Sequence, residues 1–296
     1  MRDLDDLYPY KHSIVDDLFI KTADDNYVAA RWCFYVELDV DFFWLAVHCL
    51  EKYLKAALVL NEQPAKAYVH DIEKLYAAVR PLAPELLPTI LKIPANLPTT
   101  IFSLGDEPVE QFVKRLYFYG QPDNRYLFIG YVRRGSDILK LDQLVFAVRR
   151  LCQPLESHFL ESRFKDNPEV PQETRRQRML ADDPSSRNLS SNLEKVIAGE
   201  RGKLLRRVLL NWNFPFAPKD FKHGRMSYGH RSVNPVFVRR FLEPLDAGTP
   251  HQDKHADDLW KWANENIYLP KEFVRVYEQA RSDRKAAAKA KKPKTI

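Results

Sequence analysis

Apolar residues recur at steps of three or four along residues 41–61, DFFWLAVHCLEKYLKAALVLN, which predicts a buried stripe on a long helix. The segment is rich in Ala and Leu and has no Gly or Pro, and Glu51 stands four residues before Lys55. We interpret Glu51, Lys52 and Lys55 as its solvent-exposed face. A second helical pattern begins nearby at His70-Asp71. Together the two segments predict a helical hairpin around which a bundle is built.

The longest periodic pattern covers residues 137–162, where an unbroken series of apolar positions predicts a helix about 39 Å long. Pro154 is expected to kink this helix because proline has no backbone N–H. Prolines scattered between residues 80 and 107 argue against a long helix there. Further helices are predicted over residues 26–38, 70–79, 108–119, 192–212, 234–242, 250–267 and 271–289. Because hardly any segment alternates with period two, the expected fold class is all-α.

A change in composition divides the chain. Residues 166–191 have few large apolar side chains and many Pro, Ser, Asp and Arg, which is typical of a linker. We therefore expect a helical bundle of about five helices over residues 1–165, followed by this linker. A C-terminal helical region of unknown type is expected over residues 192–280, and a basic disordered tail over residues 281–296.

Composition narrows the class of protein. A hydrophobic content of 45% with 17 Phe is enough for a core and argues against global disorder. No apolar run approaches the ~18 residues of a membrane span. The acidic N-terminus lacks the hydrophobic region of a signal peptide. Cys33, Cys49 and Cys152 are too few and too scattered for a disulfide framework or a zinc site, so buried thiols in a reducing cytoplasm are expected.

The formal net charge of +6 comes from one end of the chain. From Arg281 onward there are seven basic residues and one acidic residue, which account for the whole excess. One interpretation is that Lys289, Lys291 and Lys292 contact nucleic-acid phosphates with a salt-dependent affinity. The other is that the tail only keeps the chain soluble. The tail has no aromatic residue on which a base could stack.

The order of motifs over residues 24–165 resembles the HEPN superfamily of small prokaryotic helical bundles. The matching segments are DDNYVAAR (24–31), LAVHCLEKYLKAALVLNEQP (45–64), YVHDIEKLY (68–76), DNRYL (123–127) and VFAVRR (145–150). The resemblance implies a bundle that forms a homodimer. Many members are metal-independent ribonucleases of toxin–antitoxin or phage-defence systems, while others bind nucleotides or a nucleotidyltransferase without cleaving RNA.

The nuclease members of that family carry an Arg and a His, with four to six residues between them, near the start of the last helix. The guanidinium binds phosphate and the imidazole transfers protons. Here Arg149 and Arg150 lie in the middle of the last predicted helix, and the next His, His158, is too far along the chain. Arg225 and His230 have the family spacing, although they lie in a Gly-containing loop outside the resembling region. They are the catalytic candidates if the protein is an endoribonuclease.

The candidate phosphate contacts in the resembling region are Arg125, Arg133, Arg149 and Arg150. Convergence of Arg125, Arg133 and Arg150 in the fold would indicate an anionic ligand. His70 and Asp71 form either an acid–base pair or, as we favour, a helix start at which Asp71 complements the helix dipole.

His251 and His255 have the i,i+4 spacing of two metal ligands, but Gln252 replaces the general-base Glu of zinc proteases. A solvated helix start is the favoured interpretation, and no metal or other cofactor is expected.

The sequence thus supports two functional hypotheses. The first is a cytoplasmic HEPN-like protein that binds RNA or a nucleotide and that is an endoribonuclease if it is catalytic. The alternative is a non-catalytic interaction module whose residues 192–280 contact a protein partner. Truncation after Gln279 is a test between the two, because it weakens nucleic-acid binding strongly if the basic tail supplies that binding, and it leaves a protein complex intact.

Overall fold

The computed structural model describes residues 8–95, 97, 105–157, 173–224, 229–235, 238–243, 257, 260–261, 263–265 and 269–290. These residues are mostly helical, which confirms the predicted all-α class. The chain divides into two compact units. The first comprises residues 1–121 and 133–230, and the second residues 122–132 and 231–296. No helix in the described part of the chain combines the length and the apolar character needed to cross a bilayer.

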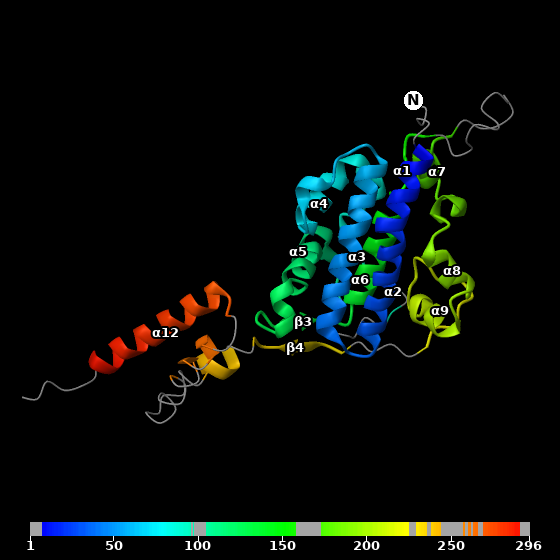
Figure 1. Cartoon of the computed structure of the whole chain (residues 1–296). Coiled ribbons are helices and arrows are strands. Elements are labelled where there is room, and N and C mark those ends of the chain that lie inside the picture. Colours follow the sequence, from blue (N-terminus) through cyan, green and yellow to red (C-terminus); the bar gives the residue numbers. More distant parts are fainter. Residues whose placement is uncertain are drawn as a thin grey trace, which may run out of the picture. The chain divides into compact units, whose positions relative to one another are not determined.

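The first unit is built around one central helix, α3 (Figure 1). α1, the π-helical turn η1 and α2 follow one another without a break, and α3 packs against α2, α4, α5 and α6. The bundle elements are α1 (Tyr8–Val15), η1 (Asp16–Ile20), α2 (Lys21–Tyr35), α3 (Asp39–Leu60), α4 (Ile72–Val79), α5 (Val109–Tyr119) and α6 (Asp137–Arg149).

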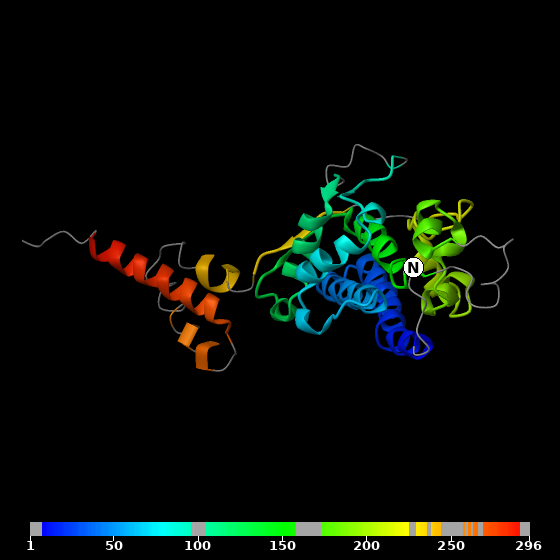
Figure 2. The same cartoon turned by 90° about the horizontal axis from the view of Figure 1, so that it is seen from above.

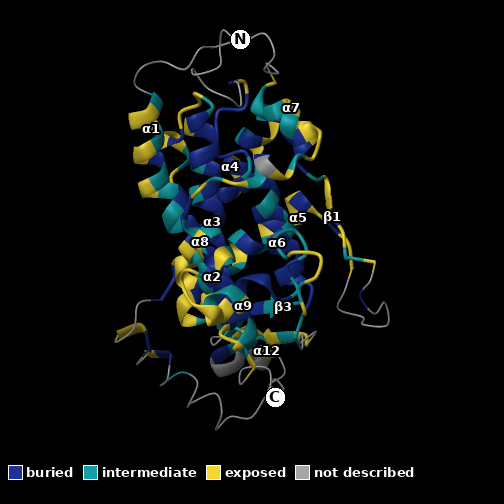
Figure 3. Cartoon of the chain, turned by 90° about the vertical axis from the view of Figure 1, so that its right-hand side faces the viewer, coloured by how far each residue is buried: buried dark blue, intermediate teal, exposed yellow. Residues whose placement is uncertain are grey.

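The apolar stripe predicted for residues 41–61 is buried in the bundle. Phe42, Cys49 and Tyr53 are completely buried, and the faces of the helices that meet inside the bundle carry the buried residues (Figure 3). At the end of α5 the approach to α3 is close, because a Cβ on Gly120 would lie 2.7 Å from the carbonyl oxygen of Phe43. Glycine at this position therefore lets the end of α5 pack against the backbone of α3.

The last bundle helix is shorter than its periodicity predicts. The expected helix over residues 137–162 ends at Arg149 and is followed by turns, and residues 158–162 lie outside the described part. The turns after Arg149 are held by hydrogen bonds to the side chain of Asn61, just after α3. Its side-chain amide donates to the carbonyls of Leu151 (3.2 Å) and Gln153 (3.1 Å), and its Oδ1 accepts from the N–H of Leu155 at 3.0 Å. A side chain distant in sequence thus holds the turns that follow α6 on both sides of Pro154.

Residues 173–191, the described part of the expected linker, are folded against the bundle. Thr174 and Gln177 form a capping box at the start of α7 (Arg175–Leu180). Arg176 forms ion pairs with Glu85 and Glu156. The turn η6 (Pro184–Arg187) follows.

A single helix predicted over residues 192–212 is two helices in the structure, α8 (Asn192–Ala198) and α9 (Lys203–Leu210). Gly199 and Gly202 separate them with φ of 88° and 98°, which favour glycine. Both helices pack against α2, on the side of the bundle opposite α4 and α5 (Figures 1 and 2). Residues 192–230 therefore belong to the first unit.

A buried ion-pair network joins these later helices to the bundle. Arg149 is 2% exposed and contacts Asp24 of α2 (2.8 Å) and Glu194 of α8 (2.7 Å). Although burial raises the pKa of Glu194, the hydrogen bond from Arg149 lowers it to about 2. Tyr53 of α3 also donates to Asp24. Four helices are thus connected through one guanidinium and two carboxylates.

The second unit has its own small core. It contains Phe128, Phe241, Trp260, Ala263, Leu269 and Tyr277. Its described elements are η5 (Pro122–Tyr126), β4 (Arg231–Val233), the π-helical turn η7 (Val238–Leu242) and α12 (Lys271–Ala290), with β4 paired to β3 (Tyr131–Arg133).

The helix expected over residues 271–289 is confirmed by α12. It makes residues 281–290 helical, where a disordered tail was expected, and residues 291–296 lie outside the described part.

Replacing Arg149 with Met is expected to lower the free energy of unfolding of the first unit by about 3–5 kcal/mol, because Asp24 would be buried without its partner. Arg201, which pairs with Asp25 at the surface, is the matched control, and Arg201→Met is expected to cost less than about 1 kcal/mol. Urea unfolding followed by circular dichroism measures both. Equal effects of the two substitutions would contradict the structural role given to Arg149.

A cationic and aromatic groove as candidate functional site

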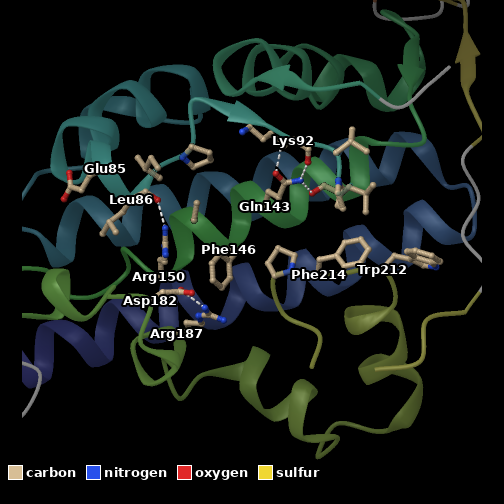
Figure 4. Close-up of a pocket in the computed structure, with 17 residues that line it drawn as sticks. Glu85, Leu86, Lys92, Gln143, Phe146, Arg150, Asp182, Arg187, Trp212 and Phe214 are labelled. Atoms are coloured by element: carbon tan, nitrogen blue, oxygen red, sulfur yellow. Dashed lines mark hydrogen bonds and ion pairs between the residues drawn. The ribbon is translucent and has the colours of Figure 1, made fainter. Parts of the chain in front are cut away.

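A groove with a volume of about 720 Å³ opens in the first unit (Figure 4). Its walls come from residues 85–94, from α6, from residues 182–187 and from residues 212–215. This volume is within the range of about 300–1,000 Å³ that is usual for small-molecule sites. Residues distant in sequence therefore form one site of ligand size.

One wall is held in place by hydrogen bonds to α6. β1 (Ile90–Leu91) pairs antiparallel with β2 (Glu107–Pro108). Directly after β1, the Lys92 N–H donates to Oε1 of Gln143 (3.1 Å), and the Gln143 amide donates to the Lys92 carbonyl at 2.7 Å. These bonds fix the backbone of the wall, while the Lys92 side chain is exposed at the rim.

Arg150 is the central cation of the groove. It is half-buried, and its Nη2 donates to the carbonyl of Leu86 at 2.6 Å. It forms no ion pair with any described residue, and its buried Nε has no hydrogen-bond partner among them. Burial lowers the pKa of Arg150, Asp182 raises it, and Arg187 lowers it. The guanidinium is thus a half-buried cation without a bonded carboxylate in the described part of the chain.

Arg187 brings a second guanidinium to the same place. Its Nη2 pairs with Asp182 at 2.5 Å, and its Nε is buried without a hydrogen-bond partner in the described part. Both arginines contact the ring of Phe146, with Cζ-to-centroid distances of 5.3 Å for Arg150 and 5.5 Å for Arg187. The aromatic ring stabilises both cations and leaves N–H groups able to bind a further acceptor.

Aromatic residues continue along the groove away from the arginines. Figure 4 shows Phe214 and Trp212 following Phe146, with Trp212 toward the far end. The rings of Trp212 and Phe214 meet edge to face with centroids 6.0 Å apart. One end of the groove is therefore cationic, and the other offers flat apolar rings.

Of the four arginines predicted from sequence, Arg150 alone lines this groove. Arg133 is buried and pairs with Asp39 at 2.7 Å, and Arg149 is buried in the network with Asp24, so both charges are already neutralised. Arg133 and Arg150 lie beyond opposite ends of α6, which is about 20 Å long. Arg125 is exposed in the second unit, where its Nε donates to the Pro122 carbonyl. The expected convergence does not occur among the arginines of the first unit.

The remaining predicted site residues are not gathered into a site that the structure describes. His230 is exposed in the first unit, but Arg225 lies outside the described residues. Lys289 belongs to α12, and Lys291 and Lys292 lie outside the described part. His251 and His255 also lie outside it. In the described regions, no group of three or more His, Cys, Asp or Glu is arranged to hold a metal, and the three cysteines are buried free thiols.

The face of α3 that was expected to be solvated contains a buried carboxylate. Glu51 is 5% exposed and accepts from Lys55 (2.7 Å) and from Nδ1 of His70 (3.0 Å). Although burial raises the pKa of Glu51, hydrogen bonds from His48 and Lys55 lower it to about 2. Asp71 caps α4 by accepting from the N–H of Lys74, as favoured from sequence, whereas the partner of His70 is Glu51.

Comparison of the chain with models of protein families, with curated proteins and with solved structures finds no match.

The sequence pattern did not identify Phe146, Arg187, Trp212 and Phe214 as site residues. Phe146 reads as one more apolar position of α6, and Arg187 lies in a segment whose composition suggested a linker. The aromatic run NWNFPF around Trp212 is the one local signal, because several aromatic residues beside proline form a poor helix and a good pocket wall.

Replacing Glu51 with Gln is expected to lower the free energy of unfolding by about 1–3 kcal/mol at pH 7, because Lys55 and His70 lose a charged acceptor. The lowered pKa of Glu51 means that its contribution is complete above the unfolded value of 4.5 and is lost as pH falls toward about 2. The difference between Glu51→Gln and wild type should therefore shrink over that window in denaturant titrations. Glu73→Gln, at an exposed position of α4, is the control; a pH-independent difference for Glu51→Gln would refute this assignment.

Proposed function

We propose that the groove binds RNA or a nucleotide, with a phosphate at Arg150 and Arg187 and a base against the aromatic wall. The observation that carries this proposal is the pair of guanidinium groups on Phe146, where Arg150 has no carboxylate partner among the described residues. Of the two acids that line the groove, Glu85 is paired with Arg176, and Asp182 is shared with Arg187. A phosphate supplies the missing negative charge and accepts from several N–H groups at once.

The aromatic residues favour a phosphate ester that carries a base over a bare anion. Phe146, Phe214 and Trp212 follow the cationic end within one groove. Proteins that bind single-stranded nucleic acid combine these two features, because every base has a flat face that stacks on an aromatic side chain. The volume of about 720 Å³ suits a mononucleotide or part of a short strand.

Membership of the HEPN superfamily is part of this proposal and agrees with it, because members of that family bind RNA or nucleotides. A homodimer and a role in toxin–antitoxin or phage-defence systems follow from the same resemblance. RNA cleavage by Arg225 and His230 stays a prediction from their spacing, and so does a protein partner for residues 192–280.

Arg150→Gln is expected to weaken binding of a fluorescently labelled single-stranded RNA hexamer by about tenfold or more, since one charge-assisted hydrogen bond to the phosphate is lost. Phe146→Leu should weaken it by a similar factor through lost stacking. Fluorescence anisotropy measures both, with ATP as a competitor for the same site.

Arg201→Gln is the matched control, because Arg201 is a surface arginine of the first unit that does not line the groove. It should bind like wild type. The proposal fails if Arg150→Gln binds the hexamer as tightly as Arg201→Gln. It also fails if truncation after Gln279 alone removes binding, because the basic tail would then be the binding element.

A further inference from the structure

The backbone of Trp212 adopts a conformation that a non-glycine residue rarely takes. Its φ is 56°, in the left-handed region, where the Cβ of an L-residue is crowded. Such a conformation persists only where surrounding contacts hold it, and it is more common at binding sites than elsewhere. Because Trp212 lines the groove, the contacts that fix its backbone also fix this part of the wall.

His223 makes the most direct of these contacts. The backbone N–H of Trp212 donates to Nδ1 of His223 at 2.9 Å, and the two rings stack with centroids 5.1 Å apart and planes 22° apart. Two further hydrogen bonds join residues 211–212 to Gly224. The Trp212 indole N–H donates to the Gly224 carbonyl (2.7 Å), and the Gly224 N–H donates to Oδ1 of Asn211 (2.7 Å).

The first of these bonds depends on the protonation state of His223. An N–H group can donate to Nδ1 only when that nitrogen carries a lone pair, so the imidazole must be neutral with its proton on Nε2. Protonation would place an N–H on Nδ1 opposite the N–H of Trp212. The bond would then be replaced by a repulsion between two donors, and the backbone of Trp212 would lose the hydrogen bond that most directly offsets its unfavourable φ.

The surroundings of His223 disfavour its charged form. The rings of Phe214 and Phe221 lie 5.4 Å from its own ring, centroid to centroid. The charged groups near it are cationic: Arg31 of α2, and Arg207 of α9, whose guanidinium lies beside Gly224. Arg31 is itself paired with the buried Asp142. Burial, and then the charge of Arg31, lower the pKa of His223.

We propose that His223 is a positioning residue for the groove: while neutral it holds Trp212 as a platform for a base, and when protonated it releases Trp212 and weakens ligand binding. This inference rests on the proposed function, since it assigns the base-binding end of the same site. The ligand concerned is one that carries a base. Loss of the Trp212 platform would not change the binding of a bare phosphate at Arg150 and Arg187.

The test is the pH dependence of binding of a single-stranded RNA hexamer without a terminal phosphate, since its phosphodiesters do not titrate between pH 5 and 8. Wild-type affinity should be constant from pH 8 to 7 and fall about threefold to tenfold by pH 5, as expected for one broken hydrogen bond. His223→Asn should bind like wild type at pH 8 and show no acid loss, because an Asn Oδ1 accepts at the place of Nδ1 without titrating. His12→Asn, on α1 away from the groove, should keep the wild-type profile.

A readout without ligand accompanies this titration. The NMR signal of the Trp212 indole N–H, assigned through its loss in Trp212→Phe, should shift between pH 7 and 5 in wild type and stay fixed in His223→Asn. Intact binding with a flat wild-type profile, or an acid loss that persists in His223→Asn, would overturn the inference alone. Absence of binding at every pH would overturn the proposed function. A Trp212 signal that ignores pH would overturn the role of His223 whether or not the hexamer binds.

Discussion

The contact of Arg149 with Asp24 and Glu194 holds the first unit together, because it joins α6 to the first and last parts of that unit at one buried point. Buried charges are costly unless they are paired and hydrogen-bonded, so these helices are stable only in the arrangement that satisfies all three groups. The groove depends on this arrangement. One of its walls is α6, and others come from residues 182–187 and 212–215, on either side of Glu194 in sequence.

The elements that could be predicted are those whose stability comes from local pattern. α3, α5 and α12 follow amphipathic periodicity, and their apolar stripes and terminal prolines or glycines are visible in the sequence. The end of α6 could not be predicted, because the turns that follow Arg149 are held by the side-chain amide of Asn61, from about ninety residues away. Residues 175–187 were misjudged for a similar reason, since few of them are apolar and long-range ion pairs of Arg176 help to dock them.

The site was only partly visible in the sequence. Arg149 and Arg150 are neighbours with the same chemistry, yet on a helix their side chains point about 100° apart. One therefore lies in the core and the other in the groove, and only the position of Asp24 and Glu194 decides which. Arg187 and Trp212 join Arg150 through folding of the segments after α6, a contact that no local spacing encodes. A sequence does not show whether an arginine is neutralised by a buried carboxylate or available to a ligand. That depends on where the fold places the carboxylates.

If the groove is the binding site, a bound base lies against its aromatic wall. Photocrosslinking with a single-stranded RNA that carries 4-thiouridine, followed by mass spectrometry of the crosslinked peptides, tests it most directly because it locates the base. Binding in the groove should give crosslinks to the peptides that contain Phe146 and residues 212–214, and these crosslinks should be lost in Arg150→Gln. Crosslinks confined to residues 271–296 would contradict it, since the basic C-terminal segment would then be the binding surface.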